Sequence, residues 1–361
     1  MQVMVLGMHR SGTSVLGAIL ELLGLSWGKS EEGLPADQDN PRGYWERQDI
    51  VALNDFLLEG CESRWDKVSR FSLERLNTKD REIFYERAKE ILGCFPSDAA
   101  YFIKDPRLCL TWREWLPLLS KPVGVFVYRD PLQVAQSLAK RNGMPLPVGL
   151  ALWQFYWLHM VLALSRMPCF LVYHDELISK PVEVVYQLFH FFQNEGFSKL
   201  KLPEEKLILS LIDPSLFRHR ESNESQMRLL NSEQVRLRQD FEQRKSIMDI
   251  SFAELSECSW EWLKFYEETT SIRESLESQL CQLQEKDSAS KKELARVLRK
   301  NESWIKSLYQ EADRLLDSLE YRVGGAMLLK RLRLKKRKKG HSIDQVMAKF
   351  QDLKQELKKK D

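Results

Sequence analysis

The sequence predicts an α/β fold, in which a parallel sheet is flanked by helices and is followed by a long C-terminal helical extension. Short apolar runs alternate with helical segments, which is the order of a parallel sheet covered by helices. Three of these runs are followed by a cation. From residue 267 onward basic residues outnumber acidic ones, and heptad spacing begins at Leu276. The four runs expected to form strands span residues 3–7, 101–103, 123–128 and 170–173.

The first expected strand leads into a turn that suits an anion. The apolar run is followed by Gly7 and a polar turn, and helical apolar spacing begins at Val15. The N-terminus of that helix would point unpaired N–H groups and a positive dipole end at the turn. The order of residues excludes a Walker A loop, because Thr13 and not Lys follows the glycine. The expected anion-binding residues are Arg10, Ser11, Gly12, Thr13 and Ser14.

A second charged motif follows the third expected strand. Arg129 comes directly after that strand, and Asp130 before Pro131 fits an N-cap followed by a proline at the first helical position. Ser137 then falls about two turns into the helix. Because the carboxyl ends of parallel strands meet at one edge of a sheet, the cations that follow three different strands are expected to lie there together. These cations are Arg10, Lys104 and Arg129.

Together, the two motifs resemble those of sulfotransferases that use 3′-phosphoadenosine 5′-phosphosulfate (PAPS). The loop GMHRSGTS is similar to the 5′-phosphosulfate loop of bacterial-type members. The resemblance implies that residues 10–14 bind the 5′-phosphosulfate and that Arg129 and Ser137 hold the 3′-phosphate. It covers roughly residues 1–220, implies a P-loop-like sheet, and requires no metal.

Three further segments resemble parts of the same family. The run of residues 104–107, KDPR, is similar to a segment whose lysine faces the transferred group, which implies a catalytic role for Lys104 beside Arg10. Residues 170–177 resemble a strand ending in Tyr-Glu-Asp-Leu, from which His174 departs. Residues 40–46 resemble an acceptor-side segment, which favours Glu46 as the base. Other carboxylates stay open as alternatives for this role: Glu31, Glu32 and Asp49.

The function implied is transfer of a sulfuryl group from PAPS to a hydroxyl acceptor, such as a saccharide or glycolipid in cell-surface polysaccharide biosynthesis. One alternative is a P-loop-type phosphotransferase or nucleotide kinase, which the missing Walker lysine disfavours. Another is a coiled-coil interaction protein with a vestigial nucleotide site. The intact residues of both motifs argue against such decay.

Composition limits the class of protein. The six cysteines lack metal-ligand spacing and a disulfide framework, so a reducing compartment and no metal are expected. No signal peptide precedes the first strand and no apolar run is long enough to span a bilayer, which predicts a cytoplasmic enzyme. The apolar segment 151–165 is expected to be a buried core helix.

The C-terminal part is predicted to differ from the catalytic domain. We expect a sulfotransferase domain over residues 1–266, a helical or coiled-coil segment over 267–322 and a basic amphipathic tail over 323–361. Heptad spacing over 276–315 favours a homodimer, with a helix that packs back on the domain as the alternative. Eight of the ten residues 330–339 are basic, which favours peripheral contact with the anionic inner face of the membrane. Nucleic acid is the less favoured partner, and a solvated charge run is the third interpretation.

Overall fold

The computed structural model describes residues 1–37, 40–96, 99–212, 227–245, 247–251, 254–284 and 296. Its centre is a four-stranded parallel sheet with strand order β2-β1-β3-β4. The strands are β1 (Gln2–Leu6), β2 (Tyr101–Lys104), β3 (Pro122–Tyr128) and β4 (Cys169–Tyr173). All four lie where the apolar runs predicted them, and the α/β class is confirmed.

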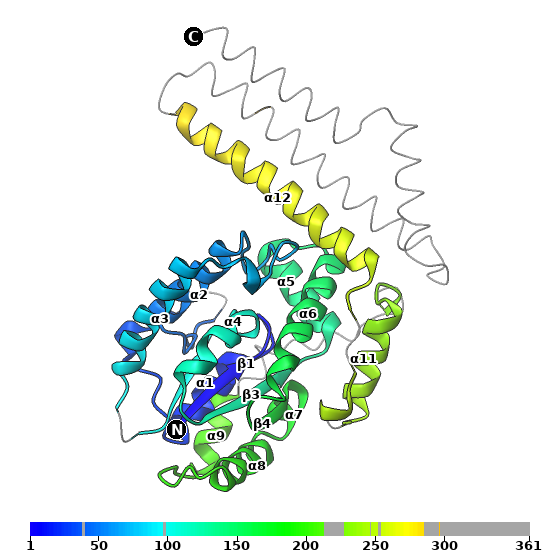
Figure 1. The fold of residues 1–361 in the computed structure, drawn as a ribbon. Coiled ribbons are helices and arrows are strands. Elements are labelled where there is room, and N and C mark those ends of the chain that lie inside the picture. Colours follow the sequence, from blue (N-terminus) through cyan, green and yellow to red (C-terminus); the bar gives the residue numbers. More distant parts are fainter. Residues whose placement is uncertain are drawn as a thin grey trace. The chain divides into compact units, whose positions relative to one another are not determined.

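Helices cover both faces of this sheet (Figure 1). Alternate residues of β1 point to opposite faces, since Val3 and Val5 pack in one apolar cluster and Met4 and Leu6 in the other. The helices that give buried residues to the cluster of Val3 are α1 (Thr13–Leu22), α8 (Pro181–Asn194) and α9 (Glu205–Leu211). Those that give buried residues to the cluster of Met4 are α2 (Gln48–Gly60), α3 (Thr78–Gly93), α4 (Leu108–Trp115), α5 (Pro131–Asn142), α6 (Leu146–Met160), α11 (Ser232–Glu242) and α12 (Glu257–Gln284). The short helix α7 (His174–Ser179) follows β4 directly and also gives a buried residue, Leu177, to the cluster of Val3.

Helix α6 is the expected buried core helix. Trp153, Tyr156 and Trp157 on it are fully buried. Contrary to our expectation that no apolar run reaches the length needed to span a bilayer, the stretch Leu146–Ala163 is apolar and long enough to do so, but 72% of it is buried inside the fold. This helix therefore belongs to the core, where it packs against both α5 and α12.

Helix α12 passes without a break through residue 266, where we predicted a domain boundary. Glu267 and Glu274, beyond that point, still bond to residues 64–69 of the globular part. The predicted boundary at 323, most of the seam 276–315 and the basic run 330–339 lie outside the described residues and stay predictions. A truncation meant to preserve the domain should therefore end after α12.

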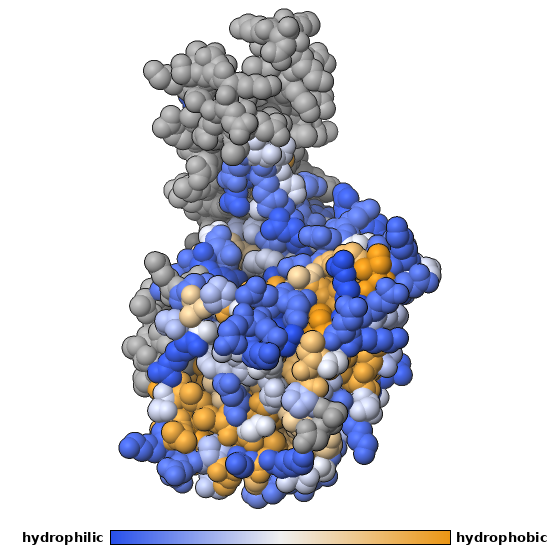
Figure 2. Space-filling model, turned by 90° about the vertical axis from the view of Figure 1, so that its left-hand side faces the viewer, coloured by the Kyte–Doolittle hydropathy of each residue, from blue (hydrophilic) through white to orange (hydrophobic). Residues whose placement is uncertain are grey.

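The surface is largely hydrophilic but has apolar areas. Figure 2, which views the molecule from the left of Figure 1, shows such areas separated by hydrophilic residues. The exposed large apolar side chains include Leu207 and Leu209 on α9. Single exposed apolar residues are ordinary on globular proteins, and we assign no partner to these.

Candidate active site

The loop between β1 and α1 has a backbone that few residues tolerate. Arg10 and Gly12 both have positive φ, 68° and 93°. For a non-glycine residue such a conformation is uncommon and strained, and it is frequent at functional sites. A Cβ atom on Gly12 would lie 2.5 Å from Cδ2 of His174. The glycine is therefore required both by its φ and by the close approach of α7.

The two sequence motifs come together at this loop. The Nε of Arg10 donates a hydrogen bond to Oγ of Ser137, at 2.9 Å. The Nη1 of Arg129 donates to the carbonyl oxygen of Arg10, at 2.7 Å, and its Nε to Oε1 of Gln133, at 3.2 Å. Residues separated by more than a hundred positions thus meet at the carboxyl edge of the sheet. This is the arrangement that the parallel topology predicted.

The electrostatics of this edge favour an anion. Burial, together with the neighbouring Arg10, lowers the pKa of Arg129 to about 10. The Oγ of Ser11 is buried and has no hydrogen-bond partner among the described residues. Thr13, also buried, begins α1. Two neighbouring guanidinium groups, an orphaned hydroxyl and a helix N-terminus fit a phosphate-bearing group.

Lys104 and Glu46 form a buried ion pair beside the loop. Nζ of Lys104 lies 2.5 Å from Oε1 of Glu46. The Lys104 side chain is 0% exposed and that of Glu46 7%. Burial raises the pKa of Glu46, and the attraction of Lys104 offsets this only in part. The structure thus brings together the residue predicted as the base and a predicted catalytic cation.

The segment that carries Glu46 lies against α1. The Asn40 amide donates to Oγ of Ser14 at 3.0 Å, and the Trp45 indole donates to Glu21 at 2.7 Å. A Cβ on Gly17 would lie 2.8 Å from Cβ of Trp45. Because α1 follows the anion-binding loop directly, these contacts hold the segment that carries Glu46 close to that loop.

The alternative bases have other contacts. Arg47 is buried and binds the carboxylates of both Glu32 and Asp49. Glu31 is exposed in a short turn of 3-10 helix. In the described structure Lys104 bonds to Glu46 and to none of these three carboxylates, so Glu46 stays our choice.

Several residues near the site were not singled out by the sequence. His9 is the residue before Arg10, and its Nε2 is buried without a hydrogen-bond partner in the part of the chain that the structure describes. The pKa of His9 is held well below its ordinary value of 6.5, chiefly because the imidazole is buried. The positive charges around it lower this pKa further, namely those of Arg107, Arg141, Lys104 and Arg10. Its place inside the GMHRSGTS loop was the only available signal.

The segment after Lys104 is anchored by a polar network. Asp105 is fully buried and accepts bonds from Asn54, at 2.7 Å, and from Arg107, at 2.9 Å. Arg107 also binds Asp55 at 2.6 Å. Burial tends to lower the pKa of Arg107, but the two carboxylates outweigh it and raise that pKa. This network fixes the end of β2, and with it Lys104, to α2.

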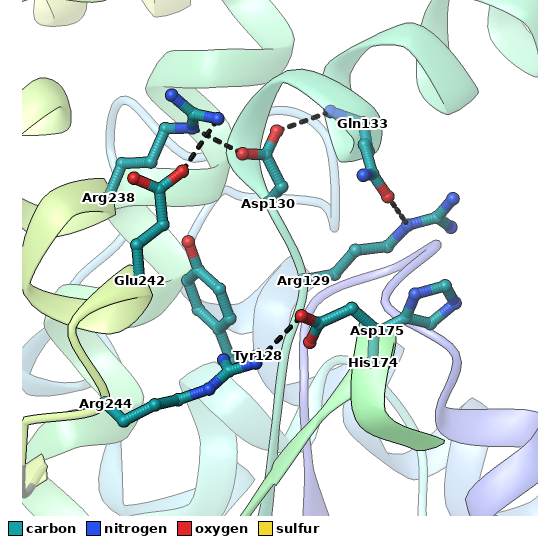
Figure 3. A pocket seen from close by; sticks show the side chains of 9 residues that line it. All are labelled: Tyr128, Arg129, Asp130, Gln133, His174, Asp175, Arg238, Glu242 and Arg244. Atoms are coloured by element: carbon teal, nitrogen blue, oxygen red, sulfur yellow. Dashed lines mark hydrogen bonds and ion pairs between the residues drawn. The ribbon is translucent and has the colours of Figure 1, made fainter. Parts of the chain in front are cut away.

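A cavity of about 220 Å³ opens beside Arg129 (Figure 3). Tyr128 lines it, and its hydroxyl is buried with no partner within the described ranges. Arg238 on α11 binds Asp130 at 2.5 Å, and Arg244 lies over the ring of Tyr173 at 3.7 Å. The arginines from the α11 region could not be foreseen from the motifs. The lining residues are Tyr128, Arg129, Asp130, Gln133, His174, Asp175, Arg238, Glu242 and Arg244.

No group of three or more His, Cys, Asp or Glu side chains suited to a metal ion occurs among the residues that the structure describes. The site thus consists of cations, hydroxyl groups, backbone amides and one ion-paired carboxylate. These groups can bind phosphates, stabilise developing negative charge and accept a proton.

Comparison with known proteins gives little further guidance. No protein-family model matches the chain, and no curated protein matches it. A solved structure that is similar is the sulfotransferase domain from the olefin synthase of Synechococcus PCC 7002, with 14% sequence identity and a TM-score of 0.36. The match covers 73% of this chain and 94% of that domain. At that level of similarity, the functional argument rests on the residues of the site itself.

Proposed function

We propose that this protein transfers a sulfuryl group from PAPS to a hydroxyl acceptor. The observation that carries the proposal is the meeting of Arg10, Arg129 and Ser137 through two hydrogen bonds, at a loop that already favours an anion. The two motifs resemble the two halves of a PAPS site, and their residues lie together as one site requires.

The residues of the loop would hold the 5′-phosphosulfate. When bound there, the 5′-phosphosulfate would supply the activated sulfuryl group. The Oγ of Ser11 gains the partner it lacks, and the N–H groups at the start of α1 face the phosphate. Arg129 and Ser137 would hold the 3′-phosphate, which offsets the repulsion between Arg129 and Arg10. The residues assigned to nucleotide binding are Arg10, Ser11, Gly12, Thr13, Ser14, Arg129 and Ser137.

Glu46 and Lys104 would perform the proton and charge steps. As the acceptor oxygen attacks sulfur, its proton passes to the Glu46 carboxylate, whose raised pKa makes it a stronger base than an exposed glutamate. Protonation of Glu46 weakens its hold on Lys104, so the ammonium can turn to the sulfuryl oxygens. The sulfur–oxygen bond to the 5′-phosphate would break at the same time, with adenosine 3′,5′-bisphosphate as the leaving group, and Arg10 would stabilise the negative charge that develops on its bridging oxygen. The ion pair therefore couples proton removal to charge stabilisation.

The acceptor is proposed to be a cell-surface saccharide or a glycolipid, used on the cytoplasmic side of the membrane. The basic run 330–339 supports this choice, because such a run brings an enzyme to an anionic membrane surface. Homodimerisation through 276–315 remains part of the same proposal.

Radiolabelled PAPS tests the proposal directly. The purified protein is incubated with [35S]-PAPS and bacterial lipid and polysaccharide fractions, and label transfer is measured. We expect transfer by the native protein and by Arg70→Ala, a control at an exposed arginine that pairs with Glu62. We expect none by Arg10→Ala. Magnesium-dependent ATP hydrolysis with no transfer from PAPS would instead support a phosphotransferase.

A further inference from the structure

The loop of residues 62–69 is bonded to α12 at several points. Glu267 accepts hydrogen bonds from both the amide and the hydroxyl of Ser69. Glu274 binds Lys67 at 2.7 Å and Arg64 at 3.0 Å. The hydroxyl of Tyr266 also lies 3.3 Å from Asp66. One face of α12 therefore fixes this loop along its length.

The same loop carries Trp65 to the anion-binding site. The ring centroids of Trp65 and His9 are 4.4 Å apart, and the guanidinium of Arg141, on α5, lies 5.5 Å from the centroid of the Trp65 ring. Tyr156 on α6 donates a hydrogen bond to the Trp65 carbonyl at 2.8 Å and also faces His9, at 6.1 Å between ring centroids. The indole thus joins the loop 62–69 to His9 and to the end of α5.

His9 precedes the residue with the strained backbone. Arg10 keeps its positive φ only because its neighbours hold it there. On one side, Arg129 and Ser137 bind its carbonyl and its guanidinium. On the other side, the packing of Trp65 and Tyr156 on His9 fixes the residue before it.

We propose that Glu267 and Glu274 are positioning residues for the nucleotide loop, which they hold in its binding conformation through Trp65 and His9. The catalytic site is then incomplete without α12, the helix from which the C-terminal extension continues. The inference rests on the proposed function only in taking the β1–α1 loop as the nucleotide site.

The contacts of Glu274, Glu267 and His9 are of kinds that can transmit a change in α12 to the nucleotide loop. Lys67 is largely buried, and Glu274 binds both it and Arg64, so loss of the carboxylate leaves two cations without that partner. Glu267 bonds to a backbone amide, which fixes the main chain rather than a flexible side chain. His9 is neutral among Arg107, Arg141, Lys104 and Arg10, so packing rather than an ion pair holds it in place.

The test compares the variant Glu267→Gln/Glu274→Gln with Glu277→Gln in the full-length protein. Glu277 lies on the same helix, is exposed, and pairs only with Arg273 in the described structure. Hydrogen exchange is measured at residues 8–12, where the Ser11 amide donates to the Met8 carbonyl at 3.1 Å. Calorimetry with adenosine 3′,5′-bisphosphate gives the affinity.

We expect faster exchange at residues 8–12 in the double variant and an affinity weaker by about threefold to thirtyfold, the range seen for substitutions that act through a packed network. Glu277→Gln should match the native protein in both. Trp65→Ala should show the same faster exchange and weaker affinity as the double variant. Trp65→Phe, which keeps a ring against His9, should have exchange and affinity closer to those of the native protein. This second pair decides the matter should the double variant not fold.

The inference is overturned if hydrogen exchange at residues 8–12 is as slow in both the double variant and Trp65→Ala as in the native protein, whatever their affinities for the bisphosphate. If the native protein itself does not bind the bisphosphate, the proposed function fails. The exchange comparison would still decide the positioning role.

Discussion

Replacing Glu46 by glutamine should both destabilise the protein and slow its reaction. The substitution keeps the side-chain shape but leaves the ammonium of Lys104, which is 0% exposed, without its charge partner. Breaking one side of a buried ion pair typically costs about 3–5 kcal/mol. For a domain of this size we expect the midpoint of thermal unfolding to fall by roughly 10 °C. Loss of a general base should also lower kcat by about 10²–10⁴, with little change in bisphosphate affinity.

A double-mutant cycle separates the ion pair from the other effects of the substitution. Lys104→Met removes the cation, and Glu46→Gln/Lys104→Met removes both charges together. Urea unfolding of the four proteins should give a coupling energy of about 2–3 kcal/mol, with the double variant more stable than Glu46→Gln alone. Equal stability of Glu46→Gln and the native protein would refute our reasoning about the pair. A near-native kcat in Glu46→Gln, with loss of activity in Glu31→Gln or Glu32→Gln, would show that another carboxylate is the base.

Three further outcomes are expected. Gly12→Ala should lose bisphosphate binding and about 1–3 kcal/mol of stability because of the clash with His174. The control Gly143→Ala, where φ is 65° and the space around the residue is open, should lose only the smaller amount of stability that a positive φ costs alanine. Equal effects of the two substitutions in calorimetry and urea unfolding would contradict this. Because the folded state holds the pKa of His9 well below 6.5, His9 should not affect stability above pH 6.5, and stability should fall as the pH drops from 6.5 towards the lowered pKa, by up to about 1.4 kcal/mol per pH unit. The urea midpoint of His9→Phe should therefore depend less on acid pH than that of the native protein. The same pH dependence in both proteins would count against a lowered pKa for His9. Truncation after Gln284 should preserve bisphosphate binding but abolish self-association and salt-sensitive adhesion to anionic liposomes, measured by light scattering and sedimentation; unchanged adhesion would exclude the basic run 330–339 as its cause.

The local features of the fold could be predicted from the sequence. The strands are short, apolar and separated by helical spacing, so Val3 to Leu6 and Val123 to Tyr128 were identifiable from composition alone. The meeting of Arg10 with Arg129 followed from one topological rule, because parallel strands bring their carboxyl ends to one edge. Asp130 caps α5 as its place before Pro131 indicated.

Long-range contacts could not be predicted in the same way. The bond between Lys104 and Glu46 joins residues 58 positions apart, and no local pattern encodes such a pair. Arg238 lies on a helix whose sequence is typical of an exposed ion-paired surface. The bond of Glu267, on α12, to Ser69 joins residues 198 positions apart and likewise has no local signal in the sequence. Polar contacts of this kind depend on the fold and leave no periodicity in the chain.

The most direct test of the account is a calorimetric comparison of two nucleotides that differ by one phosphate. Adenosine 3′,5′-bisphosphate carries the 3′-phosphate that we assign to Arg129 and Ser137, and adenosine 5′-monophosphate lacks it. Charge-assisted hydrogen bonds contribute about 1.5–3 kcal/mol each, so the bisphosphate should bind at least about tenfold more tightly. Equal affinities for the two nucleotides, or no binding of either, would contradict the assignment of this site.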